Sequence, residues 1–417
     1  MLTISELLVA PNTGAFYYDD QLAIRRGVRL NGFTLSGKPL TPGFARVRIP
    51  AESVSVGLVL SDGTVVWGDC ASVQYAGSSG RDPVLTPGQM CGLLDRRIGP
   101  KVAGLAAMSL IPNCQKLFDE NDGSTLPKSI KYGLSQALLR AASHARKITM
   151  AEVITEDMGL APPVQEVPIF AQSGDERYDN VDKMIMKSID ILPHGLINTS
   201  EKFGYRGAKF QEYVIWVAER VRALGGGGYR PALHFDTYGW VGLGISLNVV
   251  EIAEFIADIA DSVPDFDLAI ECPADFGSQE AQINGYADIV RELEALGSSA
   301  KIVADEYCNT LSDIRLFSDN KAGHIIQVKT PDLGSILDTV EAIKLVKDAG
   351  LGAYSGGTSA ETDQSAQVCV HVAVAARADM MLAKPGMGVD ESITIVRNEQ
   401  RRLLATTRHK FEKEVRA

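Results

Sequence analysis

Three carboxylates and one lysine stand at equivalent places along the chain, each directly after a short apolar run. They are Asp236 after ALHF, Glu271 after LAI, Asp305 after IVA and Lys329 after IIQV. Consecutive members are separated by about 30 residues, the length of one strand–helix unit. A single carboxylate at a strand end usually caps a helix or lies in solvent. Three on successive strands would concentrate buried charge, which is costly unless another group compensates it.

A hard divalent cation is the compensating group that suits three carboxylates. Carboxylate oxygens that leave positions open for water and substrate favour Mg²⁺ over Zn²⁺. Gln327 lies two residues before Lys329, so both side chains should point to the same face of their strand. The neighbouring Glu306 should point away from the site, because side chains alternate along a strand.

Two histidines occupy similar positions. His194, in LPHGLIN, follows Ile191 and Leu192, where another strand should end. Across a metal from Lys329, it becomes a candidate second acid or base. His234 shares a strand face with Asp236 and should lie one layer deeper, which favours a hydrogen-bonded core histidine.

The elements that must position these residues form a repeating pattern between Val167 and Ala383. Short apolar runs recur as PIFAQ, ALHFD, LAIE, IVAD, IIQVK, AYSGG and MMLAK, and helical patterns such as 248–259, 280–296 and 333–347 separate them. Together with the strand ending near His194, they give eight units of about 27 residues, which indicates a (β/α)₈ barrel with its site at the carboxyl ends of the strands. A doubly wound sheet is the alternative, but no glycine-rich phosphate motif follows a candidate strand.

The first part of the chain has a different pattern. Two alternating runs, 54–60 and 64–67, are joined by Ser61-Asp62-Gly63, a sequence typical of a hairpin turn. A strong helical pattern begins at Lys131, and strands followed by helices indicate an α+β domain. Ala161-Pro162-Pro163 marks the predicted boundary between an amino-terminal α+β domain, 1–160, and a barrel domain with a carboxyl-terminal helix, 161–417.

Composition excludes several classes of protein. The chain has 417 residues, of which 45% are hydrophobic and 22% charged, with a net charge of −11. An acidic chain without a basic block is a poor candidate for binding nucleic acid or an anionic membrane, so the expected partner is a small molecule. No run reaches the ~18 apolar residues of a membrane span. The start lacks signal-peptide features, and six scattered cysteines form no CxxC pair, so we expect a cytoplasmic protein.

Seven longer segments carry a more specific pattern: VQYAGSSGRDP, FAQSGDERYDNVDKMI, ILPHGLIN, KIVADEYCNT, HIIQVKTPDLG, AYSGGTSAETD and LAKPGMGVDE. In this order, over nearly the whole chain, they resemble the methylaspartate ammonia-lyases, members of the enolase superfamily. The resemblance implies a TIM-type α/β barrel of the (β/α)₇β type with an amino-terminal capping domain, and a homodimer. It also implies reversible loss of ammonia from L-threo-3-methylaspartate to give mesaconate, a reaction of amino-acid degradation such as glutamate fermentation, with Mg²⁺ required and K⁺ as activator.

The resemblance also assigns roles to residues. It implies that Asp236, Glu271 and Asp305 bind the metal, that Lys329 removes the C3 proton of the threo substrate, and that His194 acts on the opposite face. The implied substrate-pocket positions are Gln74, Gln172, Gln327, Tyr354, Thr358, Ser359 and Leu382. Ser359 departs from the pattern, since better-known members have cysteine there. Its hydroxyl could contact a substrate carboxylate, or Ser359 could instead cap the helix that follows.

The implied chemistry suits these residue types. Removing a proton beside a carboxylate builds an enolate, whose charge a divalent ion can stabilise, and enolase-superfamily sites use a lysine or histidine base with Mg²⁺. The lysine must be neutral to act, so its pKa must fall from about 10.4, and we expect a nearby divalent cation and partial burial to lower it.

Three alternatives stay open at this stage. A cycloisomerase or acid-sugar dehydratase would share the metal ligands, although the glutamines and the GGTSAETD segment favour an amino-acid lyase. Lys329 could instead form the Schiff base of a metal-independent aldolase. The third alternative is a barrel without catalytic activity that serves as a metal-binding or scaffold subunit.

Overall fold

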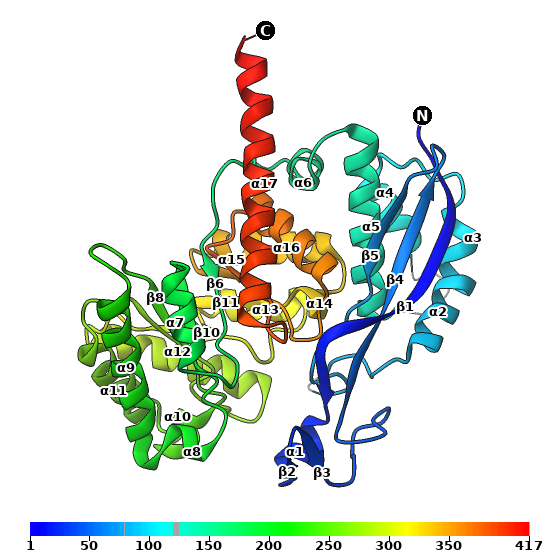
Figure 1. The fold of residues 1–417 in the computed structure, drawn as a ribbon. Coiled ribbons are helices and arrows are strands. Elements are labelled where there is room, and N and C mark those ends of the chain that lie inside the picture. Colours follow the sequence, from blue (N-terminus) through cyan, green and yellow to red (C-terminus); the bar gives the residue numbers. More distant parts are fainter. Residues whose placement is uncertain (79, 120–124, 417) are drawn as a thin grey trace.

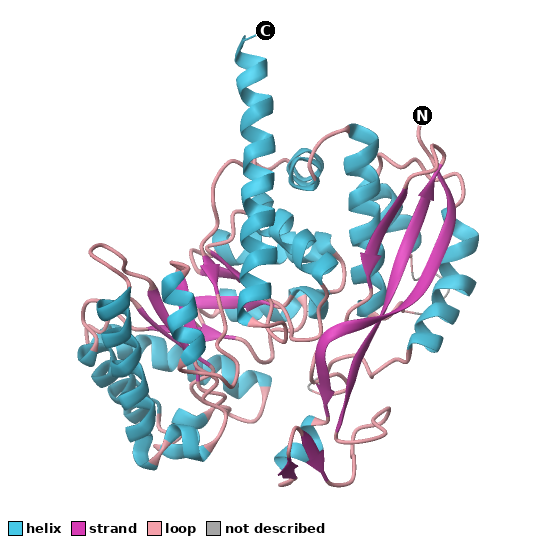
Figure 2. Cartoon of the chain, in the orientation of Figure 1, coloured by secondary structure: helices cyan, strands magenta, loops and turns pink. Residues whose placement is uncertain are grey.

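The computed structural model describes residues 1–78, 80–119 and 125–416. Two β-structures dominate it: an antiparallel sheet of long strands in the amino-terminal part and a closed barrel of short strands in the rest of the chain. Figure 2 shows the long strands on one side of the molecule and the barrel strands, surrounded by helices, on the other.

The amino-terminal part is built on the sheet β1-β4-β5. β1 pairs with β4 from Ile4 opposite Leu60 to Asp19 opposite Arg48, and the predicted β4–β5 hairpin turns at Gly63, whose φ is +85°. The elements of this part are β1 (Ile4–Asp19), α1 (Gln21–Arg25), β2 (Arg29–Asn31), β3 (Thr34–Ser36), β4 (Arg48–Leu60), β5 (Val65–Asp69), α2 (Pro87–Leu93), the π-helix η1 (Leu94–Ile98), α3 (Gly99–Val102), α4 (Leu110–Leu117), α5 (Lys128–Arg146) and α6 (Met150–Met158).

Helix α5 lies between this sheet and the helices around the barrel (Figure 1). Its predicted apolar face, with Leu134, Leu138 and Ala141, is buried, but Ser135 and Gln136 are also fully buried. They can be buried because they are hydrogen-bonded: the Gln136 side chain donates to the Asp69 carbonyl and accepts from the Asp69 amide. One side of α5 therefore packs against the amino-terminal sheet, and the helix also contacts the helices around the barrel.

The predicted barrel is confirmed. Eight parallel strands close in the order β10-β11-β12-β13-β6-β7-β8-β9, so chain order is also the order around the barrel. The strands are β6 (Ile169–Phe170), β7 (Ile191–His194), β8 (Ala232–Asp236), β9 (Leu268–Glu271), β10 (Lys301–Ala304), β11 (Ile325–Val328), β12 (Gly352–Ser355) and β13 (Met380–Leu382). Inward side chains such as Phe170, Val303 and Tyr354 fill the interior.

Helices follow the strands around the barrel. They are α7 (Asp179–Met186), α8 (Ser200–Phe203), the 3₁₀-helix η2 (Tyr205–Gly207), α9 (Ala208–Leu224), α10 (Trp240–Gly244), α11 (Val249–Ser262), α12 (Gln279–Ala295), α13 (Leu311–Asp319), α14 (Thr330–Leu333), α15 (Ile336–Asp348), α16 (Asp363–Ala376) and α17 (Val389–Arg416). The predicted helix 333–347 is wrong at its start, because Gly334 has a φ of +86° and Ser335 caps α15.

The carboxyl-terminal helix α17 packs on α16 and α7, and its last turns extend beyond the body of the molecule (Figure 1). Although it is the longest helix among the described residues, it is not apolar. Over the part of the chain that the structure describes, no helix combines the length and the hydropathy needed to cross a bilayer.

The contact between α5 and β5 gives a test of how this helix is packed against the amino-terminal sheet. A Cβ on Gly133 would lie 2.6 Å from the backbone nitrogen of Cys70, and one on Gly68 would lie 2.1 Å from the Gly133 carbonyl oxygen. Gly133→Ala should therefore lower the free energy of unfolding by about 1–3 kcal/mol through overpacking. Chemical denaturation of the unaltered and variant proteins measures the difference.

Gly88→Ala is the matched control. Gly88 also lies in a helix, α2, but an added Cβ there has no neighbour within 4 Å among the described residues. This change should leave stability unchanged or raise it by at most about 1 kcal/mol. Equal stabilities of the Gly133 and Gly88 variants would show that the close approach of α5 to β5 has no energetic importance.

Candidate active site

The carboxyl end of the barrel brings together the charged side chains predicted from the strand ends. His194, Asp236 and Glu271 are the last residues of β7, β8 and β9, while Asp305 and Lys329 directly follow β10 and β11. Asp236 and Glu271 are partners across adjacent strands. The histidine and the three carboxylates are buried, and the lysine side chain is 16% exposed. Around the barrel the order is therefore histidine, three acids, lysine.

Each carboxylate has a protein partner. Asp236 accepts from the Tyr238 amide at 2.9 Å and lies 3.3 Å from Nε2 of His194. Glu271 lies 2.7 Å from Nε2 of His234 and accepts from Nε2 of Gln327 at 2.8 Å. The nearest oxygen of Asp305 is 2.7 Å from Nζ of Lys329.

Burial and mutual repulsion of these carboxylates shape their titration. Burial, together with the charges of Asp236 and Asp305, holds the pKa of Glu271 well above its usual value. Burial also raises the pKa of Asp305 to about 6, although Lys329 opposes the shift. Three acids that repel one another from adjacent strands form a site that a cation would stabilise, and their hard oxygen donors fit Mg²⁺.

The residues present fit a magnesium ion by donor type and by charge. Among residues 1–78, 80–119 and 125–416, however, no three histidine, cysteine, aspartate or glutamate side chains are gathered closely enough to form a ready-made metal cage. The hydrogen bonds above explain this arrangement, because each carboxylate is oriented towards a neighbouring donor rather than towards a shared centre.

Lys329 differs from the sequence-based expectation. Burial favours its neutral form, but the carboxylates of Asp305 and Glu306 outweigh burial and hold the pKa of Lys329 above its usual value. We expected the pKa to fall. Here the ammonium group is paired directly with an acid, which stabilises the charged form.

The prediction that Glu306 points away from the site is wrong. Oε1 of Glu306 lies 4.0 Å from Nζ of Lys329, and Oε2 lies 3.1 Å from Nη2 of Arg81. Strand alternation does not apply because β10 ends at Ala304, before this residue. Arg81 lowers the pKa of Glu306 to about 2 in spite of burial, so this acid is ionised beside the lysine.

Arg81 is the main charged residue at the site to which sequence reasoning gave no role. It comes from the amino-terminal part, is buried, and also binds Asp332 at 3.0 Å and Asn309 at 2.9 Å. Its only sequence signal was its place in the segment VQYAGSSGRDP, one of those that carry the family resemblance.

The interpretation of His234 as a core histidine is confirmed. Its ring is fully buried, stacks on Phe170 at a centroid distance of 4.3 Å and is bonded to Glu271. Burial lowers its pKa to about 3.

His194 is also buried, but it ends β7 with a φ of +66°, a backbone conformation that non-glycine residues adopt mainly where surrounding structure imposes it.

Three predicted substrate residues meet at the loop after β12. The side-chain oxygen of Gln74, from the amino-terminal part, accepts a hydrogen bond from the Ser359 hydroxyl at 3.0 Å, and the backbone N–H of Gln74 donates to Oγ1 of Thr358 at 3.1 Å. The alternative that Ser359 caps the following helix is wrong, because Thr362 is the N-cap of α16. Ser359 is therefore a residue of the site loop.

The remaining predicted positions also lie at the barrel. Tyr354 is the third residue of β12, Leu382 ends β13, and both are buried, while Gln172 lies just beyond β6 and is half-buried. Burial and the three nearby carboxylates raise the pKa of Tyr354, so its hydroxyl keeps its proton at neutral pH. The structure thus places all twelve predicted site residues at or beside one end of the barrel.

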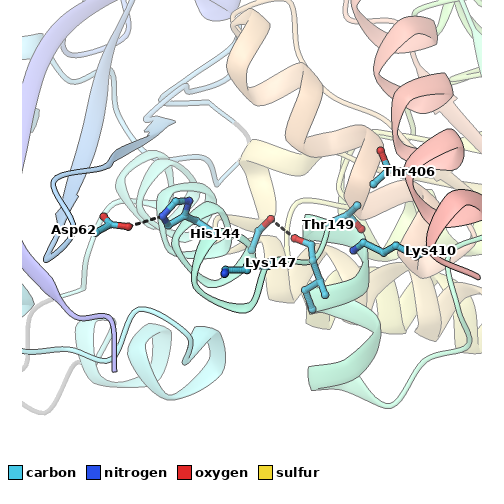
Figure 3. A pocket seen from close by; sticks show the side chains of 8 residues that line it. Asp62, His144, Lys147, Thr149, Thr406 and Lys410 are labelled. Atoms are coloured by element: carbon cyan, nitrogen blue, oxygen red, sulfur yellow. Dashed lines mark hydrogen bonds and ion pairs between the residues drawn. The ribbon is translucent and has the colours of Figure 1, made fainter. Parts of the chain in front are cut away.

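A separate hollow of about 580 Å³ lies away from this end (Figure 3). The turn at Asp62, the end of α5 with His144 and Lys147, and Lys410 of α17 line it. His144 pairs with Asp62 at 2.8 Å and Lys410 with Glu152 at 2.8 Å. None of the predicted site residues is among those that line this hollow.

Comparisons with known proteins agree with the fold and identify the family. The family model for the methylaspartate ammonia-lyase amino terminus matches residues 2–159, and that for the carboxyl terminus matches residues 163–409. Methylaspartate ammonia-lyase 2 of Carboxydothermus hydrogenoformans is 47% identical over 97% of this chain and 98% of its own length.

Solved structures extend this likeness. The Citrobacter amalonaticus methylaspartate ammonia-lyase containing (2S,3S)-3-methylaspartic acid is 44% identical, has a TM-score of 0.94, and is matched over 97% of this chain and 100% of that one. The Clostridium tetanomorphum β-methylaspartase Mg-complex is 43% identical and has a TM-score of 0.93. The match covers 98% of this chain and 100% of that one.

A muconate lactonizing enzyme of Pseudomonas fluorescens, 16% identical with a TM-score of 0.60 over 89% of this chain and 84% of that one, shares the fold alone. The two family models and the full-length relatives go further than the fold. The chain belongs to the methylaspartate ammonia-lyase family, a family of carbon–nitrogen lyases.

Proposed function

We propose that this protein eliminates ammonia from L-threo-3-methylaspartate to give mesaconate, through abstraction of the C3 proton and an enolate intermediate. The observation that carries the proposal is the order of side chains around the barrel mouth, with His194 and Lys329 on either side of three buried carboxylates. The relative that contains (2S,3S)-3-methylaspartic acid supports the choice of substrate. Absorbance of mesaconate, followed with purified protein, Mg²⁺ and 3-methylaspartate beside aspartate, glutamate and muconate, tests it.

Asp236, Glu271 and Asp305 are the proposed ligands of one Mg²⁺, an assignment that the Mg-complex of a relative supports. When bound, the ion supplies Lewis-acid stabilisation of charge that develops on the substrate carboxylate. The chain contributes a buried site whose hydrogen-bond donors, such as Gln327 and the Tyr238 amide, are already oriented. Charge interactions in such a site are stronger than in water. K⁺ is proposed as an activator.

Lys329 is the proposed base for the threo substrate. Lys329 can accept a proton only when it is neutral. The ion pair with Asp305 stabilises the charged form, so this pair must weaken and the lysine must lose its proton before it acts. Asp305 is also a proposed metal ligand, which means that metal binding and release of the lysine involve the same carboxylate. Glu306, ionised and held by Arg81, remains beside the amine to stabilise the ammonium formed after proton transfer.

His194 is proposed to act on the opposite face of the substrate. It ends β7, while Lys329 follows β11, so three strands separate the two groups on one side of the barrel and three on the other. Groups on opposite sides of the barrel mouth meet opposite faces of a planar enolate. Gln74, Gln172, Gln327, Tyr354, Thr358, Ser359 and Leu382 are the proposed substrate-binding residues.

The proposal also covers the division into domains, the oligomeric state, the cellular location and the metabolic role of the protein. Residues 1–160 form a capping domain and 161–417 the catalytic domain, a division supported by the gap between the two family matches. The protein acts as a homodimer on a small amino acid in the cytoplasm, within amino-acid degradation such as glutamate fermentation.

The metal assignment predicts a change in both activity and stability. Asp305→Ala should abolish turnover, and EDTA should do the same to the unaltered enzyme until excess Mg²⁺ is added. Because Mg²⁺ would bind the folded state and relieve repulsion there, a concentration of 100 Kd should stabilise the unaltered protein by about 2.7 kcal/mol. The variant should lose this Mg²⁺-dependent rise in Tm. Near-normal turnover of Asp305→Ala in EDTA would show that the site needs no metal.

The assignment of the base predicts that Lys329→Ala loses deamination by about 10²–10⁴-fold, because a positioned general base contributes about that factor. Exchange of the C3 hydrogen of the threo substrate with solvent should be lost in parallel. Lys344→Ala, which removes a half-buried lysine from α15, is the control and should leave both rates unchanged. Persistent exchange in Lys329→Ala would assign proton transfer to another group.

Reduction with borohydride separates this role from Schiff-base chemistry. An aldolase would retain activity in EDTA and be trapped covalently to substrate through Lys329. A lyase that uses a metal and a free lysine base would show neither result.

The proposed position of His194 predicts a difference between diastereomers. His194→Ala should lose activity on erythro-3-methylaspartate more completely than on the threo form, because only the erythro C3 proton would face this side chain. The ratio of kcat/KM values for the two substrates, compared between the variant and the unaltered enzyme, measures the effect. Equal losses on both would indicate a shared electrostatic role.

A further inference from the structure

The loop after β12 rests on a buried ion pair that the proposed mechanism does not use. Nζ of Lys384, two residues beyond β13, lies 3.1 Å from Oε2 of Glu361, and the two side chains are 1% and 0% exposed. Burying two charges costs more than their attraction returns unless further hydrogen bonds satisfy them. The other partners of this pair therefore indicate what it is retained for.

Those partners are backbone groups of the site loop. Lys384 donates to the Gly356 carbonyl at 2.7 Å, and Glu361 accepts from the Thr358 amide at 3.0 Å. Between them, a Cβ on Gly357 would lie 2.2 Å from Oε2 of Glu361 and 2.5 Å from Nζ of Lys384. The backbone of the loop thus lies directly on the ion pair, with no room for a side chain between them.

The second oxygen of Glu361 connects the loop to the amino-terminal part. It accepts from the Tyr132 hydroxyl of α5 at 2.6 Å and from the Thr330 hydroxyl at 3.3 Å. Burial raises the pKa of Tyr132 well above its usual value, so this hydroxyl keeps its proton and donates. The Cys369 thiol lies 3.6 Å from the same oxygen, so five groups around Glu361 can donate hydrogen bonds, and a carboxylate can accept from all of them.

We propose that Lys384 and Glu361 are positioning residues that hold the loop 356–358 so that Thr358, Ser359 and Gln74 meet the substrate. This inference rests on the proposed role of that loop in substrate binding. An apolar pair of similar size would be less costly to bury, but it could not bind one carbonyl and one amide of the same short loop. The geometry therefore links the pair to binding rather than to stability alone.

Three variants test this role: Glu361→Gln, Lys384→Met and the combination of both. Each single change leaves one buried charge without its partner, so both should lower Tm. The double variant removes both charges and should recover much of the Tm, since replacing a whole buried pair costs far less than breaking it. All three should raise KM for 3-methylaspartate by about tenfold or more, because each loses a charge-assisted hydrogen bond to the loop, while kcat changes less.

Glu399→Gln is the matched control. It breaks another largely buried pair, Glu399 with His371 of α16 at 3.0 Å. Within the described part of the chain, neither residue is hydrogen-bonded to the loop 356–358. This variant should lower Tm and leave KM unchanged. If the double variant recovered its Tm and had the KM of the unaltered enzyme, the pair would be structural only and the inference would be overturned.

Hydrogen exchange of the loop gives a readout independent of activity. The amide of Thr358 should exchange faster in Glu361→Gln and in the double variant than in the unaltered protein or Glu399→Gln. Absence of turnover by the unaltered enzyme would overturn the proposed function, and the exchange data would then decide the positioning role alone. Unchanged exchange at Thr358 in both variants would overturn the inference even if the enzyme were active.

Discussion

Burial of three carboxylates on adjacent strands is the constraint on which the rest of the site depends. Removed from water and close to one another, Asp236, Glu271 and Asp305 must be neutralised or paired, as the raised pKa values of Glu271 and Asp305 show. The neighbouring strands supply His194, Lys329 and Gln327 for this purpose. A barrel is well suited to the task, because parallel strands place the side chains at their carboxyl ends around one mouth.

The amino-terminal part contributes charged and polar side chains to the carboxyl end of the barrel. Arg81 pairs with Glu306 and Asp332, so a residue from outside the barrel balances the charge of two acids at the site other than Asp305, which pairs with Lys329 itself. Gln74 is oriented by a chain of contacts: its Nε2 donates to Asp19 at 2.9 Å, and Arg48 binds the same carboxylate. With Nε2 engaged in this way, its carbonyl oxygen faces Ser359. The long sheet therefore determines the orientation of a predicted substrate contact.

The segments that follow the barrel strands are less regular than the strands. Residues with left-handed backbone conformations occur at or shortly after several strand ends, at His194, Tyr238, Cys272 and Tyr307, with φ between 46° and 66°. Such conformations cost about 1–3 kcal/mol each and persist where the surrounding structure imposes them. Here they allow short turns to place side chains in the mouth, while the closed ladder of strands supplies the stability that offsets the cost.

The sequence by itself determined the barrel and most of its site. Short apolar runs at regular intervals specify buried parallel strands, and in such a barrel order along the chain becomes order around the mouth. For this reason, residues such as Asp236, Glu271 and Lys329 could be grouped correctly from their position after a strand. The segments that resemble the family then pointed to Gln74 and Ser359 as proposed substrate contacts, and no periodicity could predict that these two side chains meet.

Only the tertiary structure decided which charges meet across the two parts of the chain. The contact between Ser359 and Gln74 joins residues 285 positions apart, and that between Arg81 and Glu306 joins residues 225 positions apart. The same is true of the direction of the Lys329 pKa, which depends on the balance between burial and the two acids beside it. Local patterns record which side chains a strand or helix buries, but the field at a buried group is the sum of all charges that the fold brings near it.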